Sequence, residues 1–107
     1  MDLHLKDKIA LVTGSSRGLG YATALQLAKE GCKVAINGRD EAKIKSAAER
    51  IQKETSTQVV GLVGDASLPD MPAKLIQQTV EAFGGMDILI TNTGGPKPGA
   101  IEALDED

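Results

Sequence analysis

Short apolar runs alternate along this chain with longer segments in which apolar residues recur every three or four positions. Apolar runs rich in β-branched residues predict buried strands, and the wider spacing predicts amphipathic helices. The predicted strands are 8–13, 33–37, 58–63 and 87–91. The predicted helices are 18–30, 40–55 and a third that begins at about Ser67 and ends before Gly84. This alternation predicts an α/β fold with a doubly wound parallel sheet in the strand order 3-2-1-4.

Residues at the helix ends and on the helix faces add detail to this prediction. Gly31 is typical of a left-handed helix stop, and Asp40 is typical of an N-terminal cap for the second helix. Ser67, with Asp70 three positions later, predicts the start of the third helix. The inner face of the second helix is predicted to consist of Ile44, Ala47, Ala48 and Ile51. The inner face of the third helix is predicted to consist of Ile76, Thr79, Val80 and Phe83.

Composition and charge narrow the class of protein. The 107 residues suffice for one compact domain, and the net charge of −3 argues against nucleic-acid and acidic-membrane partners. The sequence has no long apolar segment and no signal-peptide core, so we predict a cytoplasmic protein. The single cysteine, Cys32, cannot form an internal disulfide, and we expect it to be a small buried residue or to lie at an edge. A lone histidine, His4, makes no metal site.

The most specific pattern is a glycine-rich segment between the first predicted strand and the first predicted helix. Glycines occupy positions 14, 18 and 20, in the spacing Gly-x-x-x-Gly-x-Gly. Glycine permits sharp turns and lets a ligand approach the backbone, and the unpaired N–H groups of a helix N-terminus favour an anionic phosphate. The segment therefore predicts a site for the pyrophosphate of a dinucleotide. A tight turn without a ligand is the alternative.

The predicted topology brings a second segment to the same place. Ligands of such sheets bind beyond the carboxyl ends of the strands, where the strand order reverses. Here the reversal lies between the first and fourth strands. The turn formed by Asn92, Thr93 and Gly94 after the fourth strand should therefore face the same crevice as the glycine-rich segment.

With the preceding threonine and Arg17, the glycine spacing resembles the Thr-Gly-x-x-x-Gly-x-Gly cofactor motif of the classical short-chain dehydrogenase/reductase family. The resemblance covers essentially the whole chain. It implies that residues 1–107 are the N-terminal part of a single Rossmann-type dinucleotide-binding domain, truncated after the fourth strand. The implied cofactor-binding residues are Gly14, Ser15, Ser16, Arg17, Gly18, Leu19, Gly20, Arg39, Asp65, Ala66, Asn92 and Gly94.

Two segments outside the glycine motif contribute to this resemblance. Asp65 and Ala66 follow the third strand and match the family's acidic contact to the adenine ring. The segment 89–94 matches the family's Asn-Asn-Ala-Gly turn, but Thr91 and Thr93 replace its first Asn and its Ala. The hydrogen bonds of that first Asn are therefore in doubt, whereas Asn92 and Gly94 keep the implied roles of bracing the strands and admitting the cofactor ribose.

Charge near the end of the second strand indicates the cofactor. Preference for NAD usually needs a carboxylate there for the ribose 2′-OH, whereas NADP needs a cation for the 2′-phosphate. Arg39 follows the strand and Arg17 lies in the glycine-rich segment, and an arginine fork can hold a phosphate in bidentate fashion. The resemblance also favours NADP over NAD. Asp40 is a candidate for NAD, but helix capping explains it at least as well, and both arginines could be ordinary surface charges.

The resemblance implies an NADP-dependent oxidoreductase that reduces a carbonyl to an alcohol, with 3-oxoacyl reductase the commonest example. Such enzymes use a tyrosine whose pKa is lowered by a lysine four residues later. The only tyrosine here, Tyr21, has Leu25 at that position, so we assign no catalytic residue and expect a packing role for Tyr21. The implied partners are a small carbonyl or alcohol substrate and, for the complete enzyme, further copies in a homo-oligomer. The alternative is a non-catalytic nucleotide-binding or interaction module.

Overall fold

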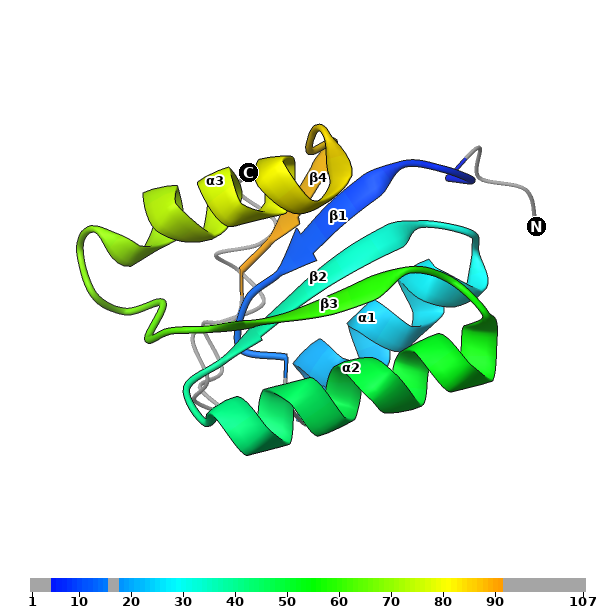
Figure 1. Ribbon diagram of the computed structural model, residues 1–107, viewed down its shortest axis with the longest axis horizontal. Helices are drawn as coiled ribbons and strands as arrows, with labels where there is room; N and C mark the ends of the chain where they lie inside the picture. The colour runs from blue at the N-terminus through cyan, green and yellow to red at the C-terminus, as the bar shows by residue number, and fades with distance from the viewer. Residues whose placement is uncertain (1–4, 16–17, 92–107) are drawn as a thin grey trace.

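The computed structural model describes residues 5–15 and 18–91, and within them seven elements form a parallel α/β fold (Figure 1). The strands are β1 (Ile9–Val12), β2 (Lys33–Gly38), β3 (Val59–Val63) and β4 (Ile88–Ile90). The helices are α1 (Gly18–Lys29), α2 (Glu41–Thr55) and α3 (Met71–Phe83). The described strands pair in parallel in the order β3-β2-β1-β4. The predicted fold class and strand order are confirmed.

Helices cover the sheet on both faces, with α1 and α2 on one side and α3 on the other (Figure 1). Alternate residues of the inner strands point to opposite faces, as the pleat requires. Val12 and Ile36 are fully buried against α1 and α2, whereas their neighbours Leu11 and Ala35 are fully buried on the α3 side. Both inner strands are therefore buried on both faces, which explains their continuous apolar runs.

Local chemistry at both ends of α2 explains its bounds. The Asp40 carboxylate accepts a hydrogen bond of 3.0 Å from the Lys43 N–H, which makes it the predicted N-terminal cap. Ser56 ends the helix in the left-handed conformation with φ of 57°. All the predicted inner residues of this helix are buried. The helix lies so close to β3 that a Cβ on Gly61 would stand 2.9 Å from the carbonyl oxygen of Ile44.

The third helix corrects the sequence prediction in two respects. It begins at Met71 rather than near Ser67, because the Ser67 N–H and hydroxyl both donate to Oδ1 of Asp65 and close a turn instead. Asp70 occupies the cap position without a side-chain cap bond.

The inner face of α3 is also displaced by about one position from the predicted one. Leu75 and Thr79, four residues apart, are its fully buried residues, and Ile76 and Phe83 are half-buried. Val80 was predicted to face inward but is 42% exposed. It lies one step around the helix from the Leu75–Thr79 line, so it is at the margin of the buried face.

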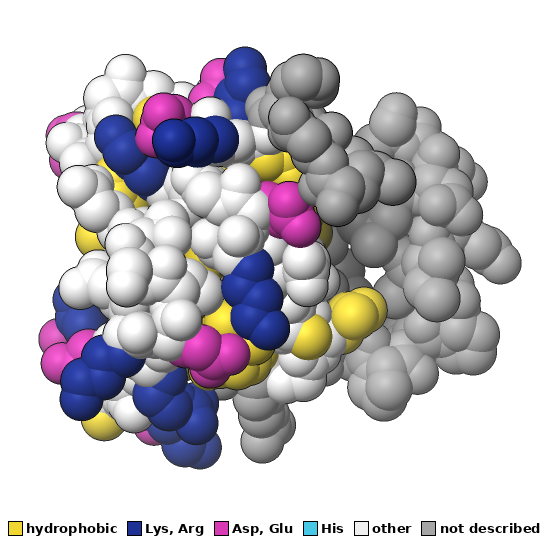
Figure 2. Space-filling view, turned by 90° about the vertical axis from the view of Figure 1, so that its right-hand side faces the viewer, with side chains coloured by type: hydrophobic (Ala, Val, Ile, Leu, Met, Phe, Trp, Pro, Cys, Tyr) yellow, Lys and Arg dark blue, Asp and Glu magenta, His cyan; other side chains and the backbone are white. Residues whose placement is uncertain are grey.

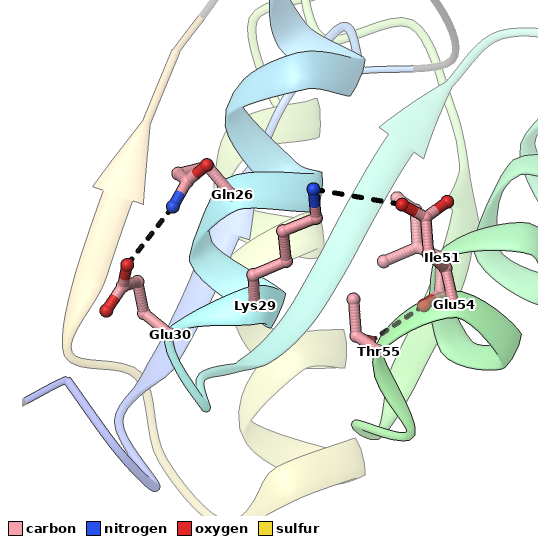
Figure 3. Close-up of polar contacts among 6 residues, drawn as sticks. All are labelled: Gln26, Lys29, Glu30, Ile51, Glu54 and Thr55. Carbon is pink, nitrogen blue, oxygen red and sulfur yellow. Dashed lines mark hydrogen bonds and ion pairs between the residues drawn. The ribbon is translucent and has the colours of Figure 1, made fainter.

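Figure 3 shows polar contacts at the far ends of α1 and α2, of which the two between charged or amide side chains are exposed. Lys29 Nζ lies 3.8 Å from Glu54 Oε2, with about half of each side chain accessible. Gln26 of α1 donates to Glu30, the residue after the helix, and the Thr55 hydroxyl donates to the Ile51 carbonyl within α2. Exposed ion pairs contribute about 0–1 kcal/mol, so the buried apolar cluster provides most of the attraction between these helices.

The edge at which the strands begin presents charged side chains of both signs (Figure 2). A shallow hollow of about 290 Å³ lies here, lined by Lys6, Asp7, Gly31, Lys33, Ser56, Thr57 and Gln58. At this edge Ile9 and Asp87 join β1 to β4. The Ile9 N–H donates to Asp87 Oδ2 at 2.9 Å, and the Asp87 N–H donates to the Ile9 carbonyl at 2.8 Å. None of the helices in the described ranges is long and apolar enough to cross a membrane.

Candidate functional site

Three loops leave the sheet side by side at the carboxyl ends of β1, β2 and β3 (Figure 1). The parallel register places Val12 beside Ile36 and Gly38 beside Val63, so the three strands end at nearly the same level. The loops begin with Thr13, with Arg39 and with Gly64, respectively. In open parallel sheets this edge is where ligands bind.

The first loop combines unusual backbone conformations with open space. Gly14 and Gly18 have φ values of 59° and 67°, which L side chains rarely adopt. A Cβ built on Gly18 would meet no heavy atom within 4 Å, so the backbone at this point faces outward. Gly18, Leu19 and Gly20 begin α1, and the first N–H groups of a helix have no intrahelical partner. Backbone donors beside open space at a helix N-terminus suit an anionic phosphate.

Asn37, near the end of β2, ties these loops together, and sequence reasoning did not single it out. Its side chain is 1% exposed. Oδ1 accepts from the Gly14 N–H at 3.2 Å, while Nδ2 donates to the carbonyls of Leu62 at 3.1 Å and Gly64 at 3.0 Å. One signal in the sequence could have found it, because Asn37 is a lone amide side chain at the end of the apolar run of β2. A buried amide at such a position needs hydrogen-bond partners.

Ser15 completes the contact between the first two loops. Its buried hydroxyl donates to the Val12 carbonyl at 2.7 Å and accepts from the Asn37 N–H at 2.9 Å. The Ser15 N–H donates to the Asn37 carbonyl at 2.7 Å. The Ser15 side chain therefore braces the loop from inside, and its predicted contact with a cofactor stays a prediction.

Arg39 and Asp65 bring opposite charges to the second and third loops. Arg39 is exposed directly after β2. Hydrogen bonds from the Ser67 hydroxyl and N–H lower the pKa of the Asp65 carboxyl, and the positive charge of Arg39 adds to this effect. The side chain of Asp40 is used to cap α2. Ala66 is half-buried against the apolar cluster on the α3 side.

The remaining residues singled out in the sequence either pack inside the protein or lie outside the described residues. The guanidinium carbon of Arg50 lies 5.1 Å from the centre of the Tyr21 ring, which packs against the α1–α2 cluster. Cys32 is buried, and burial raises the pKa of its thiol, so it stays protonated at neutral pH. The predicted site residues Ser16, Arg17, Asn92 and Gly94, and also His4, lie outside the described residues. Within residues 5–15 and 18–91, no group of three acidic, histidine or cysteine side chains could hold a metal ion.

Comparison with known proteins identifies the family. The model of the short chain dehydrogenase family matches residues 8–107. The chain belongs to this family. Among curated proteins, the glucose 1-dehydrogenase of Gluconobacter oxydans is 40% identical over 103 residues, which cover 92% of this chain and 39% of that enzyme.

Solved structures of short chain dehydrogenases share the fold. The L-sorbose reductase of Gluconobacter frateurii, determined with NADPH and L-sorbose, gives a TM-score of 0.85 at 31% identity over 91% of this chain and 37% of that one. A short chain dehydrogenase from Mycobacterium smegmatis gives a TM-score of 0.78 at 31% identity, over 82% of this chain and 37% of that one. The chain therefore spans about two fifths of the length of these relatives and matches their N-terminal portion. The Rossmann-like sheet of the family is present over this part.

Proposed function

We propose that residues 1–107 form the N-terminal, NADP-binding part of a single Rossmann-type domain in an enzyme that reduces a carbonyl to an alcohol. The observation that supports this most directly is the first loop. Gly14 and Gly18 have positive φ, and Gly18 faces open space beside the N-terminus of α1. A side chain at Gly18 would fill the space that a pyrophosphate needs, so the residues present fit a dinucleotide.

The surroundings of β2 favour NADP over NAD. An NAD-specific site usually has a carboxylate near this strand end for the ribose 2′-OH. The nearest carboxylate in sequence, Asp40, is hydrogen-bonded to Lys43, whereas Arg39 is exposed with its side chain available for a 2′-phosphate. Arg17 would add a second cation from the glycine loop. The L-sorbose reductase that shares this fold was solved with NADPH.

Each loop has a distinct role in the proposed site. The backbone of Gly14 to Gly20 would bind the pyrophosphate, Arg39 the 2′-phosphate, and Asp65 and Ala66 the adenine. Asn92 and Gly94 would lie beside the ribose. When bound, NADPH supplies the hydride that goes to the carbonyl carbon, while a proton reaches the carbonyl oxygen to give the alcohol and NADP⁺. Tyr21 packs under Arg50, so we do not assign it the role of proton donor.

The cofactor assignment is tested by reversing the charge at Arg39. In a calorimetric titration, Arg39→Glu should weaken NADPH binding by about 1–3 kcal/mol, because a charge-assisted contact is replaced by repulsion. NADH lacks the 2′-phosphate and should bind almost as before. Lys53→Glu is the matched control, because it changes the net charge equally near the far end of α2. Equal losses for both cofactors would contradict the assignment to NADP.

Substrate and catalysis call for a separate measurement. We propose a 3-oxoacyl thioester as the first substrate to assay, in a cytoplasmic enzyme that assembles as a homo-oligomer. For residues 1–107 alone we expect NADPH binding without oxidation of NADPH by the thioester. NADPH oxidation by this chain alone would contradict this expectation. Binding without turnover in the longer enzyme as well would favour a non-catalytic nucleotide-binding module.

A further inference from the structure

We propose that Asn37 is a positioning residue, which holds the three cofactor loops at the spacing that NADP requires. This inference rests on the proposed function, because it assigns a role within that binding site. Asn37 is the residue before Gly38 and Arg39, and its side chain bonds both flanking loops at once. The Asn37 side chain thereby links the loop proposed for the pyrophosphate to the loop proposed for the adenine. Asn37 also lies two residues before Arg39, which is proposed to bind the 2′-phosphate.

Hydrogen-bond capacity determines how the Asn37 amide is oriented. The Gly14 N–H needs an acceptor, and the two carbonyls of Leu62 and Gly64 need donors. The opposite orientation would set the NH₂ group against an N–H and the oxygen against two carbonyls. In the orientation observed, both amide hydrogens are donated within the protein and the side chain is buried. Asn37 therefore has no donor for a ligand, and it acts through the loops that it bonds.

The position of β2 in the sheet explains why this residue can span three loops. β2 lies between β1 and β3, so the end of β2 is next to the ends of both. The main chain strengthens the link on one side, where Ser15 and Asn37 exchange two short hydrogen bonds. On the other side the link to Gly64 depends on the Asn37 side chain and on the Gly64 N–H, which donates to the Gly38 carbonyl.

Removing the amide should loosen the loops without removing any group that contacts the cofactor. In Asn37→Ala, the exchange of the Gly14 amide hydrogen in the ligand-free chain should accelerate about tenfold, because its acceptor is lost. The dissociation constant for NADPH should rise by about tenfold, because the ligand must then order the loops on binding. Should Asn37→Ala fail to fold, Asn37→Ser is a milder second variant, because it keeps a polar group at this position. It still tests the inference, because the short serine side chain cannot reach both neighbouring loops.

Thr79→Ala provides the control for a general loss of stability. Thr79 is equally buried, and its hydroxyl donates to the Leu75 carbonyl at 2.8 Å within α3, so this hydrogen bond does not join two loops. This variant also loses a buried polar contact, but its Gly14 exchange and NADPH affinity should stay within about twofold of the wild type, because Thr79 shares no hydrogen-bond partner with Asn37.

Two outcomes separate this inference from the proposed function. If the wild-type chain binds NADPH and the Asn37 variants bind it equally well, with Gly14 exchange unchanged, the inference is overturned while the proposed function stands. If the wild-type chain binds no NADPH, the proposed function fails, and the positioning role for a cofactor fails with it. A loss of NADPH affinity in Thr79→Ala as large as in Asn37→Ala would also overturn the inference, because the effect would then be one of general stability.

Discussion

The two faces of the sheet are built from similar aliphatic residues but are packed very differently. Between the sheet and α1 and α2, a continuous cluster is buried, and the helix backbone of α2 closely approaches β3. On the α3 side, Leu11 is fully buried, but Leu89, its register partner on the neighbouring strand, is 45% exposed. Residue type is the same at these two positions and burial is not. The comparison teaches that the stability a side chain contributes depends on how completely its position is covered, and on the α3 face that cover is incomplete at β4.

Truncating one aliphatic side chain on each face, Ile36 and Leu89, gives the largest expected contrast. Ile36→Ala should lower the free energy of unfolding by about 2–5 kcal/mol, because it leaves a cavity in the α1–α2 cluster. Leu89→Ala should cost only about 1 kcal/mol, because the side chain is already half in water. Urea denaturation of both variants measures the difference. Similar losses would show that the α3 face is as well packed as the other.

Adding a methyl group to one glycine on each side sharpens the same contrast. Gly61→Ala places a Cβ 2.9 Å from the Ile44 carbonyl, so α2 and β3 must separate, at a cost of about 1–3 kcal/mol. Gly64→Ala places a Cβ 2.6 Å from the sulfur of Met71, whose flexible side chain can move aside, so the cost should be below about 1 kcal/mol. Thermal unfolding of the pair tests this, and the reverse order would contradict it.

The smallest expected effect concerns the helix caps. Asp40→Ala removes the bond to the Lys43 N–H and should destabilise α2 by about 1 kcal/mol. Asp70→Ala should have almost no effect, because the Asp70 side chain makes no cap bond to α3. Chemical denaturation of both variants at neutral pH measures the difference. A comparable loss from Asp70→Ala would mean that both helices depend on their caps to the same extent.

The sequence predicted best what depends on local pattern. Strand order followed from the alternation of strands and helices, and the Asp40 cap followed from a residue type at a helix start. The start of α3 was wrong because Ser67 bonds backward to Asp65, and a local motif does not reveal which of two turns will form. Val80 was placed inward because several apolar residues of α3 fit a helical stripe equally well.

Asn37 was missed for a different reason. Its partners Gly14, Leu62 and Gly64 are more than twenty residues away in sequence, so the role exists only once three strands are side by side. Glycine spacing predicted the loop, because backbone freedom is encoded by residue type at that position. The residue that holds the loop in place is defined by strand pairing, which a single sequence does not display.

The link between Ile9 and Asp87 has a consequence for the order of folding. Asp87 is 78 positions from Ile9, whereas β1 and β2 are joined by a single short helix. Closing a long chain segment costs more entropy than closing a short one, so we expect β1, β2 and β3 to associate before β4 docks. During synthesis β1 is then a temporary edge strand with unpaired N–H and C=O groups. The nascent chain should be most prone to aggregation in that interval, and the arrival of Asp87 at β1 would end it.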